Sequence, residues 1–392
     1  MQLVLKSGKE DALLRFHPWV FSGAIKRIDG APEEGDVVEV VSSDGQPLGV
    51  GHYQTGSIAV RMLSFAPCSI DEQYWKQQLR AALRLRKSMG LVDSADTTCY
   101  RWVHGEADGL PGLIVDVYGS TAVMQAHSVG IYRARNDIAK ALKKVGGGRI
   151  KAVYDKSSGT APPFEANLNV ADSYLLGKRQ HEPVLEHGLK FEVDWEAGQK
   201  TGFFLDQREN RSLLERYSAG RSVLNMFCYT GGFSVYALRG GAKEVVSVDS
   251  SVRAMEQAFR NVELNLGRTT LHTAITGDGF DYLRSIDQRH NLIVLDPPAF
   301  AKHIGALKNA LQAYRRLNAL ALKQIQPGGI IFTFSCSQVV SREQFRSAVF
   351  AAAVDSHRPV KILHQLTQPA DHPISIFHPE GEYLKGLVLQ VN

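Results

Sequence analysis

Residues 223–234 read VLNMFCYTGGFS, an apolar run that ends in a loop with two adjacent glycines. The run predicts a buried β-strand, and the glycines let the loop backbone approach a ligand where a Cβ atom would collide. A second apolar run, 244–249, ends in Asp249, which is placed to accept hydrogen bonds from a ribose diol. A strand, a glycine loop and a strand-ending acid in this order predict a nucleotide-like cofactor on an open α/β sheet.

Strands and helices alternate from residue 189 onward. Further strands are predicted at 271–274, 292–295, 330–334 and 386–390, with helices at 232–239, 251–265 and 306–325. This alternation predicts a mainly parallel, doubly wound sheet with its ligand site at the carboxyl ends of the strands.

The N-terminal half has a different pattern. Residues 1–68 hold short apolar runs separated by glycine-containing turns, which is typical of a small β-rich module. Beyond it we expect helices at 71–89 and 130–145, strands at 100–103, 113–117 and 122–126, and an irregular loop or junction at 156–180. The predicted domains are therefore 1–70, 71–185 and 186–392.

Composition limits the class of protein and its compartment. Of 392 residues, 44% are hydrophobic and 22% are charged, as in ordinary globular proteins. No apolar run approaches the roughly 20 residues that span a bilayer, and the N-terminus has no signal-peptide pattern, so we expect no membrane partner. The four cysteines have no paired spacing. We therefore expect no disulfide framework, no metal and a cytoplasmic location, and a homodimer is compatible with the sequence.

Two segments are strongly basic, within a chain of net charge +5. The first, residues 74–90, contains no acid, and its basic residues are Lys76, Arg80, Arg84, Arg86 and Lys87. The second, residues 131–151, contains one acid, Asp137, and its basic residues are Arg133, Arg135, Lys140, Lys143, Lys144, Arg149 and Lys151. These segments form either solvated helix faces or a surface that contacts RNA phosphates.

Two strand ends carry the side chains that indicate a reaction. The strand at 292–295 runs into Asp296-Pro297-Pro298, and the strand at 330–334 runs into Cys336. A thiolate that adds to carbon 6 of a pyrimidine makes carbon 5 nucleophilic enough to take a methyl group. Asp296 is suited to bind the ring edge at N3 and the exocyclic amine, and to assist proton transfer. This pair predicts chemistry on a nucleobase.

These residues also have other interpretations. An isolated cysteine is most often a small buried hydrophobe, and Asp-Pro-Pro occurs in enzymes that methylate nitrogen atoms without a cysteine. Cys228 is a competing thiol, expected to be incidental because it lies in the cofactor loop. Asp278, in TGDG beyond the third strand, is placed near an adenine edge, but Asp249 and Asp278 could instead cap helices.

The combined motifs resemble class I S-adenosylmethionine-dependent methyltransferases. Over essentially the whole chain they are similar to bacterial large-subunit ribosomal RNA cytosine-5 methyltransferases related to methyltransferase I. The landmarks are HPWVFSG at 17–23, GEADGLPG at 105–112, KTGFFLDQR at 200–208, YTGGF at 229–233, DPP at 296–298, FSCS at 334–337 and DHP at 371–373.

The resemblance implies an N-terminal PUA-like RNA-binding β-barrel, a central α/β domain and a Rossmann-like methyltransferase domain. It implies that S-adenosylmethionine is bound by Phe204, Gln207, Tyr229, Thr230, Gly231, Gly232, Asp249, Ser250, Asp278 and Asp296. It further implies that Cys336 and Asp296 catalyse cytosine-5 methylation of 23S ribosomal RNA, with substrate contacts from Arg208, Pro297 and Pro298. Arg208 could instead form an ordinary salt bridge. Two positions depart from the family pattern: Ala299 stands where lysine is common, and Cys228 where serine is more usual.

Two other functions remain open from the sequence. One is an RNA guanine N-methyltransferase, which needs Asp-Pro-Pro but no cysteine, so Cys336 is the discriminating residue. The other is a non-catalytic RNA-binding ribosome assembly factor. That function predicts a damaged cofactor loop, whereas the glycine loop, Asp249 and Asp278 are all present.

Overall fold

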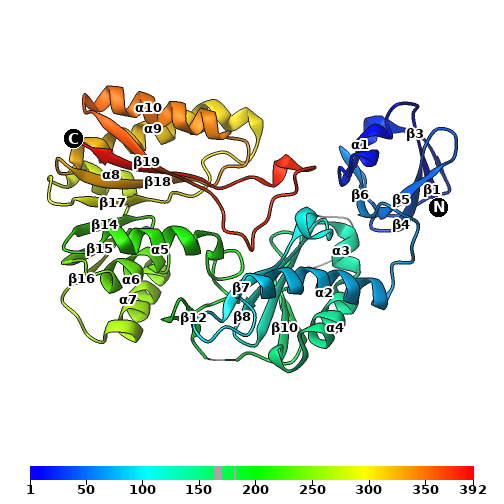
Figure 1. Ribbon diagram of the computed structural model, residues 1–392, viewed down its shortest axis with the longest axis horizontal. Helices are drawn as coiled ribbons and strands as arrows, with labels where there is room; N and C mark the ends of the chain where they lie inside the picture. Colours follow the sequence, from blue (N-terminus) through cyan, green and yellow to red (C-terminus); the bar gives the residue numbers. More distant parts are fainter. Residues whose placement is uncertain (163–169, 181) are drawn as a thin grey trace. The chain divides into compact units, whose positions relative to one another are not determined.

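The computed structural model describes residues 1–162, 170–180 and 182–392, which group into two compact units (Figure 1). Unit 1 comprises Met1–Gly188, Val193–Leu205 and Ala370–Gly381, and unit 2 comprises Leu189–Glu192, Asp206–Pro369 and Glu382–Asn392. The boundaries of the three domains expected from the sequence stay a prediction. No helix within the described ranges is long and apolar enough to cross a membrane.

The N-terminal module of unit 1 is a six-stranded sheet in the order β2-β6-β5-β4-β1-β3. Its elements are β1 (Gln2–Leu5), α1 (Asp11–Leu14), β2 (Trp19–Phe21), β3 (Ile25–Asp29), β4 (Val37–Val41), β5 (Pro47–Tyr53) and β6 (Ile58–Ser64). Side chains alternate between buried and exposed along β4, as expected for a strand with one face on a core. The expected β-rich module is confirmed.

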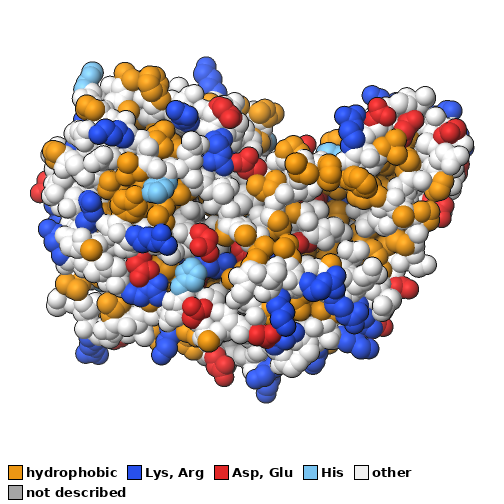
Figure 2. All heavy atoms as spheres, in the orientation of Figure 1, with side chains coloured by type: hydrophobic (Ala, Val, Ile, Leu, Met, Phe, Trp, Pro, Cys, Tyr) orange, Lys and Arg blue, Asp and Glu red, His pale blue; other side chains and the backbone are white. Residues whose placement is uncertain are grey.

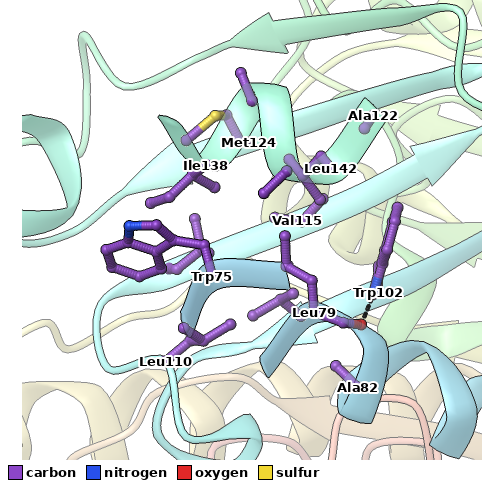
Figure 3. Packing of buried hydrophobic residues seen from close by; sticks show 14 of the residues in the cluster. Trp75, Leu79, Ala82, Trp102, Leu110, Val115, Ala122, Met124, Ile138 and Leu142 are labelled. Carbon is purple, nitrogen blue, oxygen red and sulfur yellow. Dashed lines mark hydrogen bonds between the residues drawn. The ribbon is translucent and has the colours of Figure 1, made fainter. Parts of the chain in front are cut away.

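The rest of unit 1 is a five-stranded sheet, β11-β10-β9-β8-β7, covered by helices. Its elements are α2 (Glu72–Ser88), β7 (Cys99–His104), β8 (Leu113–Tyr118), β9 (Thr121–Ala126), α3 (Val129–Arg133), α4 (Arg135–Gly146), β10 (Ala152–Asp155) and β11 (Ser173–Leu176), followed by β12 (Val184–Glu186). Trp75 and Leu79 of α2 pack with Ile138 and Leu142 of α4 in one buried cluster (Figure 3). The indole of Trp102 in this cluster donates to the Leu79 carbonyl at 3.0 Å.

Two expectations for this region need correction. The helix expected at 130–145 is two helices, because the chain leaves the regular helix at Ala134, whose ψ is −1°. The expected loop at 156–180 contains β11, which pairs antiparallel with β10 at the edge of the sheet. This strand has only four residues, and their burial does not alternate, so it leaves little period-2 pattern in the sequence. Residues 163–169 of that predicted loop lie outside the described residues.

Unit 2 contains a seven-stranded sheet in the order β16-β15-β14-β17-β18-β20-β19. Its strands are β14 (Ser222–Met226), β15 (Glu244–Asp249), β16 (His272–Thr276), β17 (Leu292–Leu295), β18 (Gly329–Ser335), β19 (Val360–Leu366) and β20 (Lys385–Val391), and β13 (Leu189–Phe191) precedes them. The first five in chain order are parallel, whereas β20 is antiparallel to β18 and β19. The predicted doubly wound α/β fold is confirmed, with an antiparallel insertion.

Helices cover both faces of this sheet (Figure 1). They are α5 (Arg208–Tyr217), α6 (Gly232–Arg239), α7 (Val252–Leu266), α8 (Gly279–Ser285), α9 (Leu307–Gln324) and α10 (Arg342–Ser356). Short 3₁₀ helices lie at Ser22–Ala24, Gly105–Asp108, Gly147–Arg149, Leu205–Gln207, Ile304–Ala306 and Pro379–Gly381. Tyr314 and Leu317 of α9 share one core with Phe345 of α10 and with sheet residues such as Ile293 and Leu295. This core fixes the strands whose ends carry the candidate site.

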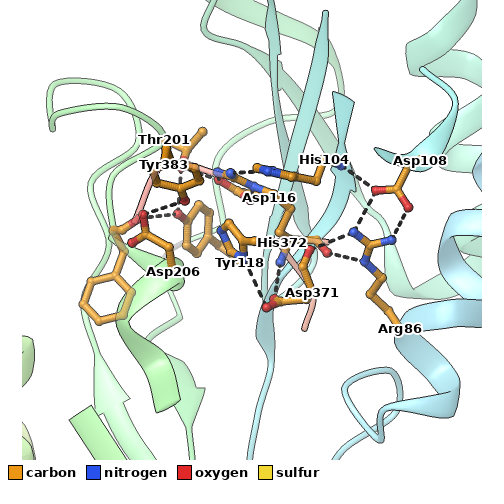
Figure 4. Close-up of polar contacts among 12 residues, drawn as sticks. Arg86, His104, Asp108, Asp116, Tyr118, Thr201, Asp206, Asp371, His372 and Tyr383 are labelled. Atoms are coloured by element: carbon orange, nitrogen blue, oxygen red, sulfur yellow. Dashed lines mark hydrogen bonds and ion pairs between the residues drawn. The ribbon is translucent and has the colours of Figure 1, made fainter. Parts of the chain in front are cut away.

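A buried ionic network in unit 1 ties together segments that are far apart in the chain (Figure 4). Arg86, one of the residues expected on a basic surface, is fully buried and forms a two-pronged ion pair with Asp108 at 2.5 and 2.8 Å. Its guanidinium also donates to the Asp371 carbonyl at 2.7 Å. Asp116 pairs with Arg101 and accepts from Thr201 at 2.6 Å. The network therefore includes residues from three of the landmark segments, 105–112, 200–208 and 371–373.

Loss of this ion pair should destabilise unit 1. Asp108→Ala leaves the buried Arg86 charge without its carboxylate, and we expect the free energy of unfolding to fall by about 3–5 kcal/mol. All four tryptophans (Trp19, Trp75, Trp102 and Trp195) lie in unit 1, so urea denaturation followed by tryptophan fluorescence reports this unit.

The matched control is Asp29→Ala, which removes an exposed partner of Arg27 and should cost less than about 1 kcal/mol. Equal losses in the two variants would contradict a special role for the buried pair.

Candidate active site

The predicted site residues of unit 2 gather at the carboxyl edge of its parallel strands. The glycine loop follows β14, Asp249 ends β15, Asp278 follows β16, Asp296 follows β17 and Cys336 follows β18. Because β14 pairs with β15 and with β17, and β17 pairs with β18, these strand ends lie at one edge of the sheet. This edge is where open α/β sheets bind ligands.

The loop between β14 and α6 has an unusual backbone. Phe227, Tyr229 and Gly231 all have positive φ, at 56°, 47° and 80°. A Cβ on Gly231 would lie 2.9 Å from Cβ of Ala258, and one on Gly232 would lie 3.1 Å from the Arg211 side chain. The protein's own packing and the positive φ therefore require glycine at 231, whereas a side chain at 232 would have to displace Arg211.

The two acids proposed for the adenosyl group have different surroundings. Asp249 is partly buried, and its oxygens accept from the Tyr229 and Ser251 backbone N–H groups at 3.0 and 2.9 Å. Asp278 is exposed and caps α8, accepting from the Asp281 N–H at 3.0 Å. Asp278 therefore has the helix-capping role that the sequence left open. Asp249 does not have it, because Ser251 is the residue that caps α7. Ser250, next to Asp249, is exposed.

These residues fit an adenosyl cofactor. The two backbone donors fix the Asp249 carboxylate in place, and its remaining lone pairs can accept from a ribose diol. In the described parts of the chain, no side chain caps the start of α6, so the N–H groups of its first turn can receive a carboxylate. Thr230 is buried, and its carbonyl is held by the Asn261 amide at 2.9 Å. The loop is therefore preorganised.

Asp296 lies at the end of β17 in a partly buried position. Desolvation by burial, with the negative charge of Asp206 adding to it, raises the pKa of Asp296 to about 7. A hydrogen bond from Gln207 and the charge of Arg211 oppose this rise. Near neutral pH the carboxyl group is therefore poised between its acid and base forms, as suits a proton-transfer residue.

Cys336 follows β18 and is partly exposed. Its Sγ donates to the carbonyl oxygen of Pro297 at 3.8 Å, so the thiol lies against the Asp-Pro-Pro segment. The residues on either side, Ser335 and Ser337, are fully buried, and the Tyr314 hydroxyl contacts the Ser337 hydroxyl at 2.9 Å. The structure thus brings the predicted thiol and the predicted acid segment together.

Cys228, the competing thiol, is buried against Met255, with 3.5 Å between the two sulfur atoms. Burial, with the nearby charge of Asp249 adding to it, raises the pKa of the Cys228 thiol. The thiol form is therefore favoured, and this residue is a poor nucleophile.

The other predicted contacts divide between the units. Gln207 and Arg208 are buried in unit 2, where Gln207 accepts from the Asn210 amide at 2.6 Å. Phe204 belongs to unit 1. Pro297 is buried and Pro298 is exposed.

Comparisons with known proteins agree with this architecture. A family model of PUA-like domains matches residues 3–65, and one of S-adenosylmethionine-dependent methyltransferases matches residues 170–372. Curated relatives named "Ribosomal RNA large subunit methyltransferase I" include one from Erwinia tasmaniensis, 39% identical and covering 100% of this chain and 99% of its own. Another, from Aeromonas hydrophila, is 40% identical and covers 99% and 98%. The chain belongs to this methyltransferase family. S-adenosylmethionine is its cofactor.

Solved structures show the same fold. The methyltransferase matches a Streptococcus mutans protein described as a candidate S-adenosylmethionine-dependent methyltransferase, with a TM-score of 0.84, 24% identity and 100% coverage of both chains. A second match, to a candidate methyltransferase crystallised with SAH, has a TM-score of 0.85, also at 24% identity and full coverage. At this identity the likeness concerns the fold.

Sequence reasoning gave no role to several residues at the site of the methyltransferase. Asp206 and Arg211 act on Asp296 through their charges, and the Tyr383 hydroxyl donates to Asp206 at 2.7 Å (Figure 4). Two features of the sequence could have pointed to these residues. Asp206 lies within the landmark segment 200–208, and Arg211 stands three residues after Arg208, which places both on one face of α5. Tyr383 gave no signal, because its place depends on the non-local pairing of β20. In the part of the chain that is described, no group of three or more His, Cys, Asp or Glu side chains could hold a metal ion.

Proposed function

We propose that this methyltransferase forms 5-methylcytosine in large-subunit (23S) ribosomal RNA through a covalent bond between Cys336 and carbon 6 of the base. The observation that supports the proposal is the 3.8 Å contact between the Cys336 thiol and the carbonyl oxygen of Pro297, the residue after Asp296. The substrate class is supported by the curated relatives, which are named for ribosomal RNA of the large subunit.

The residues of this chain supply the activation of the base. The Cys336 thiolate donates an electron pair to carbon 6, and the carbon 5–carbon 6 π electrons make carbon 5 nucleophilic. The glycine loop and Asp249 would hold S-adenosylmethionine, which when bound would supply the methyl group that carbon 5 takes. Loss of the carbon 5 proton to a base then restores the double bond and breaks the carbon–sulfur bond, which returns Cys336 as thiolate.

The raised pKa of Asp296 favours cytosine over guanine as the target. A protonated carboxyl group has one donor and one acceptor, which match N3 and the exocyclic amine of cytosine. The guanine edge presents two donors, N1–H and the amine, which match an ionised carboxylate instead. A carboxyl group with a pKa of about 7 is available in the protonated form, whereas an ordinary aspartate is not.

The test is to incubate the protein with S-adenosylmethionine and RNA that contains 5-fluorocytosine. Fluorine cannot leave as a proton does, so the adduct should persist and be visible as a shifted band. Peptide mass spectrometry should place the RNA on Cys336, and the product of natural RNA should be 5-methylcytosine. Methylguanine in natural RNA with no adduct would favour guanine N-methylation. Neither product nor adduct would favour a non-catalytic assembly factor.

A basic surface on unit 1 supports an RNA partner. Lys and Arg side chains gather over α2 and α4 (Figure 2), and Glu72 of α2 forms ion pairs with Lys76 of the same helix and with Lys144 of α4. The exposed members are Arg80, Arg84, Lys87, Lys140, Lys143 and Lys144. Arg86, predicted in this set, is excluded because it is buried with Asp108.

RNA affinity should therefore fall steeply as salt is added. If Lys140 and Lys143 contact phosphates, Lys140→Ala/Lys143→Ala should lower the slope of log affinity against log salt by about 0.7–0.9 per contact. Filter binding across a salt series measures this slope. The matched double variant Lys243→Ala/Lys361→Ala, which changes two exposed lysines of unit 2, should leave it unchanged. Equal slopes in both variants would argue against the α2–α4 surface. A cytoplasmic location and a homodimer stay predictions.

A further inference from the structure

Lys385 begins β20, the strand inserted between β18 and β19. It is 2% exposed, which is rare for a lysine. In the antiparallel register of β18 and β20, Lys385 lies opposite Ser335, the residue before Cys336. Its Nζ donates to the carbonyl of Ser337, the residue after Cys336, at 2.7 Å. The lysine is therefore tied to the chain on both sides of the thiol.

No carboxylate among the described residues forms an ion pair with the Lys385 ammonium. Its hydrogen-bond partners in the described chain are two neutral carbonyl oxygens, those of Ser337 and of Tyr383, the latter at 2.8 Å. Glu382 is near enough to interact electrostatically, but its carboxylate pairs with Arg342 at 2.5 Å. A buried charge in such a place is costly unless an anion compensates it. A thiolate at Cys336 would be that anion.

We infer that Lys385 is the cation that holds Cys336 in its thiolate form and so prepares it to attack the base. This inference rests on the proposed role of Cys336 as nucleophile. Lys385 acts through Cys336, so it is a positioning residue. Its two carbonyl contacts hold the ammonium as a donor to Ser337, the residue after Cys336, and deprotonation of the thiol releases its proton to solvent.

The electrostatics agree with this geometry. Burial is the largest influence on Lys385 and lowers its pKa to about 8, while the charge of Cys336 works in the opposite direction. Glu382 also raises the pKa and Arg342 lowers it. On the side of α9, the Tyr314 hydroxyl is the titratable group that interacts with Cys336, and burial raises its pKa. Tyr314 is thus neutral at physiological pH and leaves Lys385 as the compensating charge.

The test is the pH dependence of Cys336 alkylation by iodoacetamide, with the modified peptide quantified by mass spectrometry. In the wild type, the inflection should lie below the ordinary cysteine value of about 8.5. Lys385→Met, which keeps the length of the side chain and removes the charge, should raise the inflection by about one pH unit or more. Lys385→Arg keeps the positive charge, so its inflection should lie close to that of the wild type. A purely structural role for Lys385 would leave the inflection in place.

The matched control is Lys361→Met, an exposed lysine on the neighbouring strand β19, which should behave as the wild type. A wild-type inflection at or above about 8.5 overturns the inference even if Lys385→Met fails to fold. An unchanged inflection in a folded Lys385→Met variant also overturns it. The measurement needs no RNA, so its failure is distinguishable from that of the proposed function. A shifted inflection without 5-methylcytosine would support the ion pair and reject only the target base.

Discussion

Cys336→Ala should lower the rate of RNA methylation by at least about 10⁴-fold, because a methyl side chain cannot form the proposed covalent bond to carbon 6 that activates carbon 5. The adduct with 5-fluorocytosine should disappear in the same variant. Transfer of a tritiated methyl group from S-adenosylmethionine to RNA measures the rate. Binding of S-adenosylmethionine should be unchanged, because the glycine loop and Asp249 lie on other strands.

Cys228→Ala provides the matched control. Its thiol is buried against Met255, and its raised pKa disfavours the thiolate, so this variant should keep both the adduct and most of the activity. An adduct that persists in Cys336→Ala and disappears in Cys228→Ala would reverse the assignment of the nucleophile.

Asp296→Asn is expected to have the second largest effect, a loss of about 10²- to 10⁴-fold in kcat. The amide keeps one donor and one acceptor for the cytosine edge but cannot pass a proton to N3 as charge develops on the ring. The pH profile gives the sharper result. The pKa of Asp296 is raised to about 7, so the protonated form predominates below pH 7 and falls tenfold per pH unit above it. The wild-type rate should therefore decline on the alkaline side, and Asp296→Asn should lose this decline.

A matched change at Asp206 tests the cause of this behaviour. The charge of Asp206 raises the pKa of Asp296, so Asp206→Asn should move the alkaline decline to lower pH. A decline that stays in place in Asp206→Asn, or that persists in Asp296→Asn, would show that another group titrates.

The sequence by itself determined the parallel part of the sheet and the order of the motifs along it. The apolar runs 223–226 and 292–295 are buried at every position, so their identity as strands is encoded locally. Each motif follows its strand directly, and parallel strands present their carboxyl ends at one edge. The gathering of the glycine loop, Asp249, Asp296 and Cys336 could therefore be predicted without coordinates.

Only the tertiary structure decided what surrounds those residues. Arg86 lies in a basic segment, yet it is buried with Asp108, because burial depends on which face of α2 meets the rest of unit 1. The pKa of Asp296 depends on Asp206, which is 90 positions earlier in the chain. Lys385 stands 49 residues after Cys336, and it lies opposite Ser335 and donates to the Ser337 carbonyl because β20 enters the sheet antiparallel between β18 and β19. Such non-local pairing leaves no period in the sequence, since the energy that selects it comes from packing between distant segments.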